Sequence, residues 1–313
     1  MGRLRPTTSP GEDILLTQRC ILGRSRACTL RIADPKVSGE HASLRWVAGA
    51  WELQDLHSRN GTFVEGRRLA PGERAEVTLG TIIGLGRMDS FMLANADPPE
   101  AFAAPLGAGP PIMTQGGLLG LPDPVAPLLT VLRMRDGWMV ERAGESVAVA
   151  DGEIVRIGAD AWKLHLPEPL SQTEDSMLSP PSIDNITLRF HVSRDEEYVE
   201  LFALHDTSII DLKARSHHYT LLVLARARLR DRMLPSDRQG WVLQSDLLTM
   251  LHVDANHLYL DIYRLRRLFG EAQIANAAHI VERREGSRAL RIGVARIEIV
   301  PLDGHARGER TQT

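Results

Sequence analysis

The sequence predicts a multidomain protein with an N-terminal all-β sandwich, a small β module and a C-terminal α+β domain. Its 313 residues exceed the usual size of a single hydrophobic core. Short strand-like runs separated by turn residues dominate up to about residue 212, and a helical period appears only after that point. Two stretches rich in Pro, Gly or Ser divide the chain. We therefore expect domains over 12–96, 128–168 and 186–300, linkers over 97–127 and 169–185, and a tail over 301–313.

The N-terminal part contains nine short runs of strand-forming residues with turn signals between them. They lie at 14–17, 20–22, 29–32, 42–47, 51–53, 62–64, 75–79, 82–85 and 90–93. Strands this short and this closely spaced favour an all-β sandwich. In such a fold the loops at one end converge, and a rigid sheet presents them to a ligand.

Three residues on the expected loops fit the recognition of a phosphorylated side chain. A phosphate ester carries roughly −1.5 to −2 charges and three acceptor oxygens, so a selective site needs a fixed fork of donors and a few neutral donors. Arg24 supplies the fork, and Ser38 and Asn60 supply the neutral donors. All three stand beside turn-forming residues. The sequence therefore predicts a phosphate-binding site at one edge of the sandwich.

The motifs Gly23-Arg24, Ser38-x-x-His41 and Asn60-Gly61-Thr62 occur in this order, and with them residues 12–96 resemble a forkhead-associated (FHA) domain. The resemblance implies that Arg24, Ser38 and Asn60 contact phosphothreonine and that Arg59 touches the peptide or the phosphate. It also implies a supporting role for Gly23, His41, Gly61 and Thr62, with His41 bracing the loop that presents Ser38.

One position departs from the FHA pattern. The residue after Ser38 is often Arg or Asn in the family, and here it is Gly39, which offers only its backbone N–H. We expect Arg59 to supply the missing positive charge. The alternative is an FHA fold that has lost ligand binding.

The second β-rich part has strand-like runs at 128–134, 138–141, 146–149, 154–157 and 161–166. Residues 151–158 resemble the closing strands of an FHA sandwich, and Trp138 takes the place that Trp51 has in the first copy. None of the three phosphate-site motifs is present in it. If this part is a degenerate partial repeat, it cannot bind phosphate by the same chemistry, and we interpret it as a small β module that packs on a neighbour rather than as a second ligand site.

Charge is distributed unevenly along the chain. The net charge is −3, but residues 97–185 carry 13 acidic and 5 basic side chains, whereas 215–296 carry 14 arginines, no lysine and 8 acidic side chains. This asymmetry indicates an anionic partner for the C-terminal third.

The C-terminal third continues with strands at 188–192, 198–204 and 208–212, and then changes to a helical period. We expect a helix over 217–233, a short helix over 244–251, and a longer helix that Asp254 caps and Gly270 ends. Two helices joined by a tight turn form a helix-turn-helix. Strands at 279–284 and 288–294 would add a β wing.

The longest helix has two distinct faces. The face that should seal the core contains Leu258, Ile262, Leu265 and Phe269. The face expected to point outward contains Asn256, Leu260, Tyr263, Arg264 and Arg267. Arg pairs with guanine edges or phosphates and Asn with adenine, so this face suits a DNA major groove. The wing adds Arg283, Arg284 and Arg288 for phosphate or minor-groove contact.

Residues 187–300, with the run Tyr263-Arg264-Leu265-Arg266-Arg267-Leu268, resemble the winged-helix output domain of bacterial response regulators of the OmpR/PhoB type. The resemblance implies that the Arg-bearing helix enters the major groove and that the wing touches the backbone. The alternative is a winged helix retained for protein contacts.

Together these patterns indicate a cytoplasmic, phosphothreonine-responsive transcriptional regulator downstream of a Ser/Thr kinase. Its partners would be a phosphothreonine-containing protein, either the kinase or its substrate, and DNA, with homodimerisation as a further possibility and no membrane contact. The alternative is an adaptor that assembles kinase-dependent complexes without touching DNA. Catalytic motifs are absent, Cys20 and Cys28 lack metal-ligand spacing, and adjacent His217 and His218 point apart on a helix, so we expect no enzyme, cofactor or metal.

Overall fold

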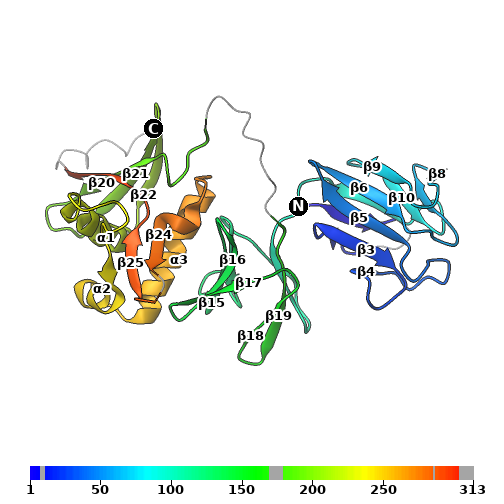
Figure 1. The fold of residues 1–313 in the computed structure, drawn as a ribbon, viewed down its shortest axis with the longest axis horizontal. Helices are drawn as coiled ribbons and strands as arrows, with labels where there is room; N and C mark the ends of the chain where they lie inside the picture. The colour runs from blue at the N-terminus through cyan, green and yellow to red at the C-terminus, as the bar shows by residue number, and fades with distance from the viewer. Residues whose placement is uncertain (8–10, 169–178, 285, 303–313) are drawn as a thin grey trace, which may run out of the picture. The chain divides into compact units, whose positions relative to one another are not determined.

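The computed structural model describes residues 1–7, 11–168, 179–284 and 286–302 (Figure 1). Within these residues the chain forms two compact units. The first contains residues 1–101 and 165–168, and the second contains residues 102–164 and 179–302. No described helix is both long and apolar enough to cross a membrane.

The first unit is a sandwich of two sheets. One sheet has the order β2-β1-β11-β10-β7-β8, with β1 Arg3–Pro6, β2 Ile14–Leu15, β7 Thr62–Val64, β8 Arg67–Arg68, β10 Ile82–Leu85 and β11 Phe91–Asn95. The other has the order β4-β3-β5-β6-β9, with β3 Arg19–Gly23, β4 Leu30–Arg31, β5 Ala42–Val47, β6 Ala50–Asp55 and β9 Arg74–Val77. Alternate side chains of β6 are buried, as expected for a strand with one face on the core. The predicted β sandwich is confirmed.

The sandwich begins earlier than residue 12. Strand β1 pairs with β11, which places Leu4 opposite Leu93, and both side chains are fully buried. They join Leu22, Leu44 and Trp51 in the core between the sheets.

Residues 102–164 form two four-stranded sheets. The first has the order β13-β12-β19-β18, with β12 Phe102–Pro105, β13 Ile112–Met113, β18 Ile154–Ile157 and β19 Asp160–His165. The second has the order β14-β15-β16-β17, with β14 Leu118–Leu121, β15 Leu129–Met134, β16 Gly137–Arg142 and β17 Glu145–Val149. The prediction of a linker over 97–127 is therefore wrong. Its Pro and Gly residues lie largely at the turns and ends of short apolar strands, and Leu118, Leu119 and Leu121 are buried.

The remainder of the second unit combines a sheet, three helices and a hairpin. The sheet has the order β22-β21-β20-β26, with β20 Thr187–Val192, β21 Val199–His205, β22 Ser208–Ala214 and β26 Arg296–Pro301. The helices are α1 His218–Arg230, α2 Gln244–Leu251, α3 Ala255–Glu271 and the 3₁₀ turn η1 Ala277–Ile280. A three-stranded sheet follows in the order β23-β25-β24, with β23 Val242–Leu243, β24 Val281–Arg284 and β25 Ala289–Ile292.

Helix α3 begins where the sequence predicts. The carboxylate of Asp254 accepts a hydrogen bond from the backbone N–H of His257 at 2.8 Å, which satisfies one free donor of the first turn. The predicted end is wrong, because the helix does not stop at Gly270 but continues through it to Glu271. All four residues of the predicted core face, Leu258, Ile262, Leu265 and Phe269, are buried.

Candidate functional site

Three loops of the sandwich meet at Ser38, at the end of the sheets where β3, β5 and β7 begin or end. The backbone N–H of Arg24 donates to the carbonyl oxygen of Ser38 at 2.9 Å. The backbone N–H of Arg59 donates to the hydroxyl oxygen of Ser38 at 3.0 Å, and the amide of Asn60 donates to the carbonyl oxygen of Lys36 at 2.7 Å. These bonds bring together the loops that carry Arg24, Ser38 and the Arg59-Asn60 pair.

The buried side chain of His41 connects two of these loops by hydrogen bonds. Its buried imidazole accepts the backbone N–H of Ser38 at Nδ1, 3.0 Å away, and Nε2 lies 3.1 Å from the carbonyl oxygen of Gly61. These partners require a neutral ring with the proton on Nε2. Burial lowers the pKa of His41 and so favours that neutral form.

Asp55, at the end of β6, organises the loop that carries Arg59 and Asn60. Its buried carboxylate accepts hydrogen bonds from the backbone and hydroxyl of Ser58, at 3.1 and 2.5 Å, and from the hydroxyl of Thr62 at 2.6 Å. Burial opposes ionisation, but these hydrogen bonds outweigh it and lower the pKa of Asp55. Sequence reasoning missed this residue, although an Asp three residues before Ser58 is a common turn signal.

Two glycines allow the loops to approach one another. A Cβ atom on Gly23 would lie 2.2 Å from the carbonyl oxygen of Gly39, so only glycine fits there. Gly61 has a φ of +89°, a conformation that other residues rarely adopt. A Cβ atom on Gly39, in contrast, would meet no atom within 4 Å.

The loops leave several hydrogen-bond donors exposed. The side chains of Arg24 and Arg59 are exposed, and within the described residues neither guanidinium has a hydrogen-bond or ion-pair partner. The hydroxyl of Ser38 accepts one bond and retains its proton, and Asn60 retains one N–H. Two cationic forks and two neutral donors on adjoining loops can bind a doubly charged oxyanion.

The residues predicted to point outward from helix α3 differ in their exposure to solvent. Asn256 and Arg264 are exposed as expected, but Tyr263 is only 3% exposed. Its hydroxyl donates to the carbonyl oxygen of Pro124 at 2.9 Å, and Arg267 reaches the same oxygen at 3.4 Å. The prediction that this side of α3 faces solvent is therefore wrong at Tyr263, because the turn between β14 and β15 covers it.

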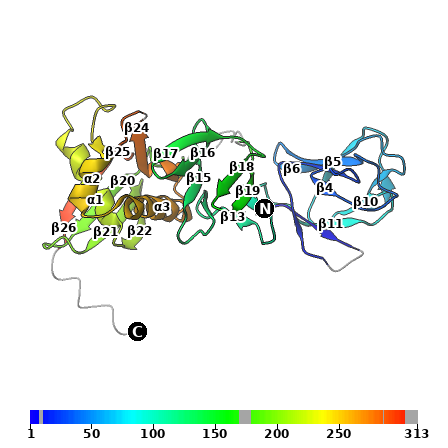
Figure 2. The same cartoon turned by 90° about the horizontal axis from the view of Figure 1, so that it is seen from below.

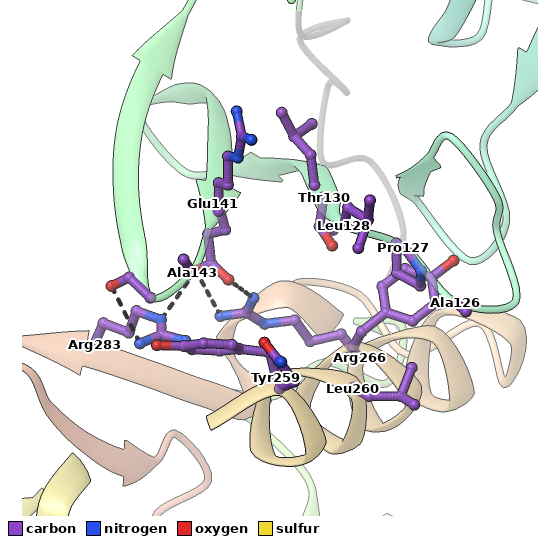
Figure 3. A pocket seen from close by; sticks show the side chains of 15 residues that line it. Ala126, Pro127, Leu128, Thr130, Glu141, Ala143, Tyr259, Leu260, Arg266 and Arg283 are labelled. Carbon is purple, nitrogen blue, oxygen red and sulfur yellow. Dashed lines mark hydrogen bonds and ion pairs between the residues drawn. The ribbon is translucent and has the colours of Figure 1, made fainter. Parts of the chain in front are cut away.

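Arg266, which the sequence analysis placed on neither face, lies at the centre of this contact. It is 1% exposed and donates to the carboxylate of Glu141 at 2.6 and 3.2 Å (Figure 3). It also donates to the carbonyl oxygens of Ala278 and Val281. Arg283 shares the same carboxylate at 3.4 Å. Burial opposes the charge on Glu141, but the two guanidinium groups outweigh it and lower the pKa of the carboxyl.

The arginines predicted for the wing differ in their surroundings. Arg283 is half-buried against Tyr259 and the carbonyl oxygen of Gly144. Arg284 is exposed, with its guanidinium 4.6 Å from the ring centroid of Trp241, and Arg288 is exposed beside Glu145. Arg284 and Arg288 are therefore accessible, whereas Arg283 is engaged within the second unit.

His217 and His218 are buried at the start of α1. Burial lowers the pKa of His217 to about 4 and that of His218 to about 3. Within the described residues no three His, Cys, Asp or Glu side chains stand together as a metal site.

Residues 20–86 match the model of the FHA domain family. Similar solved structures include the FhaA FHA domain complexed with the intracellular domain of another protein, at 28% identity over 30% of this chain and 98% of that chain, with a TM-score of 0.27. A second, from a study of phosphothreonine-dependent FHA interactions, has 30% identity over 29% of this chain and 92% of that chain, with a TM-score of 0.26. Mycobacterium tuberculosis EmbR in complex with a low affinity phosphopeptide has 22% identity over 29% of this chain and 23% of that chain, with a TM-score of 0.27. A search of curated proteins gave no match. The family model confirms that residues 20–86 lie in an FHA domain.

Proposed function

We propose that this protein is a phosphothreonine-responsive transcriptional regulator acting downstream of a Ser/Thr kinase. The observation that carries the sensing half is the loop junction at Ser38, where exposed Arg24 and Arg59 flank donors fixed by His41. Phosphothreonine suits this junction because its dianion matches the cationic forks and its three oxygens match the neutral donors. Gly39 leaves room above the loop, so Arg59 supplies the second positive charge.

Binding of a phosphothreonine peptide library to the full chain tests this half. Arg24→Ala should weaken binding at least tenfold, because a charge-assisted hydrogen bond is worth about 1.5–3 kcal/mol. The matched control is Arg26→Ala, which removes an exposed arginine from the same loop. Equal affinity of wild type and Arg24→Ala, or equal binding of phosphorylated and unphosphorylated peptides, would remove the sensing role.

The output half is a winged helix-turn-helix that binds DNA. Its support is the succession of α2, a tight turn, α3 and the β24–β25 hairpin, with Arg264 exposed on α3 and Arg284 and Arg288 exposed near the hairpin tip. The excess of arginine over acidic residues in 215–296 has the sign required for a phosphate backbone.

Selection of DNA sites with the full chain at low salt tests this half. Arg264→Ala should weaken binding to the selected site, by about tenfold if it makes a base contact. Arg189→Ala, which removes a half-exposed arginine paired with Glu298 on the sheet and distant in sequence from α3, should leave it unchanged. A failure to enrich any sequence, with binding that does not weaken as salt rises, would refute the DNA-binding role.

An adaptor that assembles kinase-dependent complexes is the second candidate. The observation in its favour is the burial of Tyr263 and Arg266 under residues 118–145, which removes part of the α3 surface from contact with any large partner. An adaptor would retain Arg24-dependent capture of phosphoproteins and recover no genomic DNA in the same pull-down.

A further inference from the structure

We propose that residues 102–164, called here the masking module, occlude the DNA-facing side of α3 and keep the full chain in a state of low DNA affinity. The inference rests on the DNA-binding half of the proposed function. It assigns a role to residues 102–164, which the phosphopeptide site does not use.

The first observation is the ionic centre of the contact. Glu141, on β16 of the masking module, binds Arg266 on α3 and Arg283 on β24 with one carboxylate (Figure 3). These are donors of the kind that would otherwise meet phosphate oxygens. A buried carboxylate that holds two arginines therefore takes the place of nucleic-acid phosphate on this surface.

The second observation is that the masking module and α3 lie very close together at three glycine residues. A Cβ atom on Gly120 would lie 2.7 Å from the hydroxyl of Tyr263, and one on Gly144 would lie 1.9 Å from the hydroxyl of Tyr259. At the end of the helix, a Cβ atom on Gly270 would lie 1.9 Å from the carbonyl oxygen of Gly116. The contact thus follows α3 over most of its length, with β15, β16 and β17 beside it in Figure 2.

The third observation is that the contact is only partly packed. Its apolar centre is a small cluster of Leu118, Leu132, Tyr263 and Ala278. Beside it lies a cavity of about 430 Å³ lined by both Glu141 and Tyr259. Leu128, at the edge of this cavity, is 64% exposed. An interface with a void and a small apolar centre has fewer dispersion contacts to lose when it opens than a continuous core.

The consequence is competition for one surface. With the masking module in place, Arg264, Arg284 and Arg288 remain exposed, but Tyr263, Arg266 and Arg283 are engaged. A helix that must enter a groove about 12 Å wide cannot do so with a β sheet along its side. Specific binding therefore requires release of the masking module. The free energy needed for that release lowers the apparent DNA affinity of the full chain.

Two variants of the full chain open the contact by different means. Gly270→Ala inserts a methyl group against the backbone of Gly116, at a helical position where alanine is intrinsically favourable. Its matched control is Gly107→Ala in the same module, where an added Cβ meets nothing within 4 Å. Glu141→Gln weakens the ionic centre, and its control is Glu153→Gln, which alters an exposed carboxylate of the same module that accepts a hydrogen bond from the backbone N–H of Ala150.

Each protein is measured for affinity to the selected DNA site and for amide hydrogen exchange in residues 118–147 and 256–271. We expect Gly270→Ala and Glu141→Gln to increase exchange in both segments and to tighten DNA binding about tenfold, and both controls to match wild type. Faster exchange with unchanged DNA affinity would overturn the masking role and leave DNA binding intact. Unchanged exchange in both variants would overturn the proposal, because it would show that neither contact holds the masking module on α3. Faster exchange with no specific DNA binding in any protein would refute the DNA-binding function, and the masking role with it.

Discussion

His41 and Gly23 determine the geometry of the proposed phosphate site, although neither is placed to touch a ligand. The imidazole of His41 fixes the backbone of Ser38 and Gly61, and the missing side chain of Gly23 lets its strand end lie against Gly39. Preorganised loops avoid part of the entropy cost of ordering them when a peptide binds. The affinity of the site therefore depends on residues below it as well as on Arg24.

The glycine pair offers a test of this dependence. Gly23→Ala should weaken phosphopeptide binding at least tenfold and lower the free energy of unfolding of the sandwich by about 1–3 kcal/mol, because its methyl group would overlap the Gly39 carbonyl. Gly39→Ala makes the same chemical change in open space and should bind within about twofold of wild type. Peptide titration and urea unfolding measure both. Equal loss in the two variants would mean that the loop contact is not what sets the affinity.

The sequence predicted the roles of some individual residues but not those of others. Arg24, Ser38 and Asn60 stand in motifs, and the structure brings the loops that carry them together through Ser38. Arg266 could not be assigned in this way, because its partner Glu141 lies 125 positions away. A buried ion pair between distant segments leaves no local pattern, only the opposite charge of the two regions.

At the level of strands and helices, the patterns that repeat locally were the reliable ones. The short strands of the sandwich and the core face of α3 follow from periods of two and 3.6 residues, and the structure has both. The linker expected over 97–127 failed because Pro and Gly occur equally in linkers and in the turns of a sheet. The apolar run Leu118–Leu121, which forms β14, was the contrary signal.

The outward face of α3 shows a limit of helical periodicity. The period separates a core side from an opposite side, but it does not say whether the opposite side meets water or another segment. Tyr263 lies on that opposite side and is buried by the masking module. A tyrosine among arginines fits either outcome, since its ring can be buried while its hydroxyl finds a partner.

Over the whole molecule, the second compact unit should lose stability in acid through a pair of buried histidines. The second unit contains His217 and His218, whose pKa values of about 4 and about 3 lie below the ordinary value of 6.5. Their ring centroids are 5.1 Å apart, and the Nε2 atom of each ring is buried without a hydrogen-bond partner. Protonation of either ring would bury a charge close to Arg215, and at His217 Arg264 adds to this repulsion while Asp261 offsets part of it.

The sign of the pH dependence follows from these depressed values. The unfolded chain takes up protons below about pH 6.5, whereas the folded rings remain neutral until about pH 4 and 3. The stabilisation is therefore complete above pH 6.5 and is lost as the pH falls. Between pH 7 and 5 each histidine should remove about 2 kcal/mol from the free energy of unfolding of the second unit, at roughly 1.4 kcal/mol per pH unit.

Hydrogen exchange at pH 7 and 5, corrected for the intrinsic effect of pH on exchange, reports both units in one sample. His218→Leu should lower the stability of the second unit at pH 7 but reduce its decrease between the two pH values by about 2 kcal/mol, because one titrating group has gone, while His217 and His279, whose pKa values burial also lowers, still titrate. His257→Leu, which changes an exposed histidine on α3, should leave the decrease as in wild type. Carboxylates such as Glu141 contribute only at lower pH, since their ordinary pKa values lie near 4 and are lowered further in the fold. A decrease that persists in full in His218→Leu would therefore show that protonation of His218 does not contribute to the acid sensitivity.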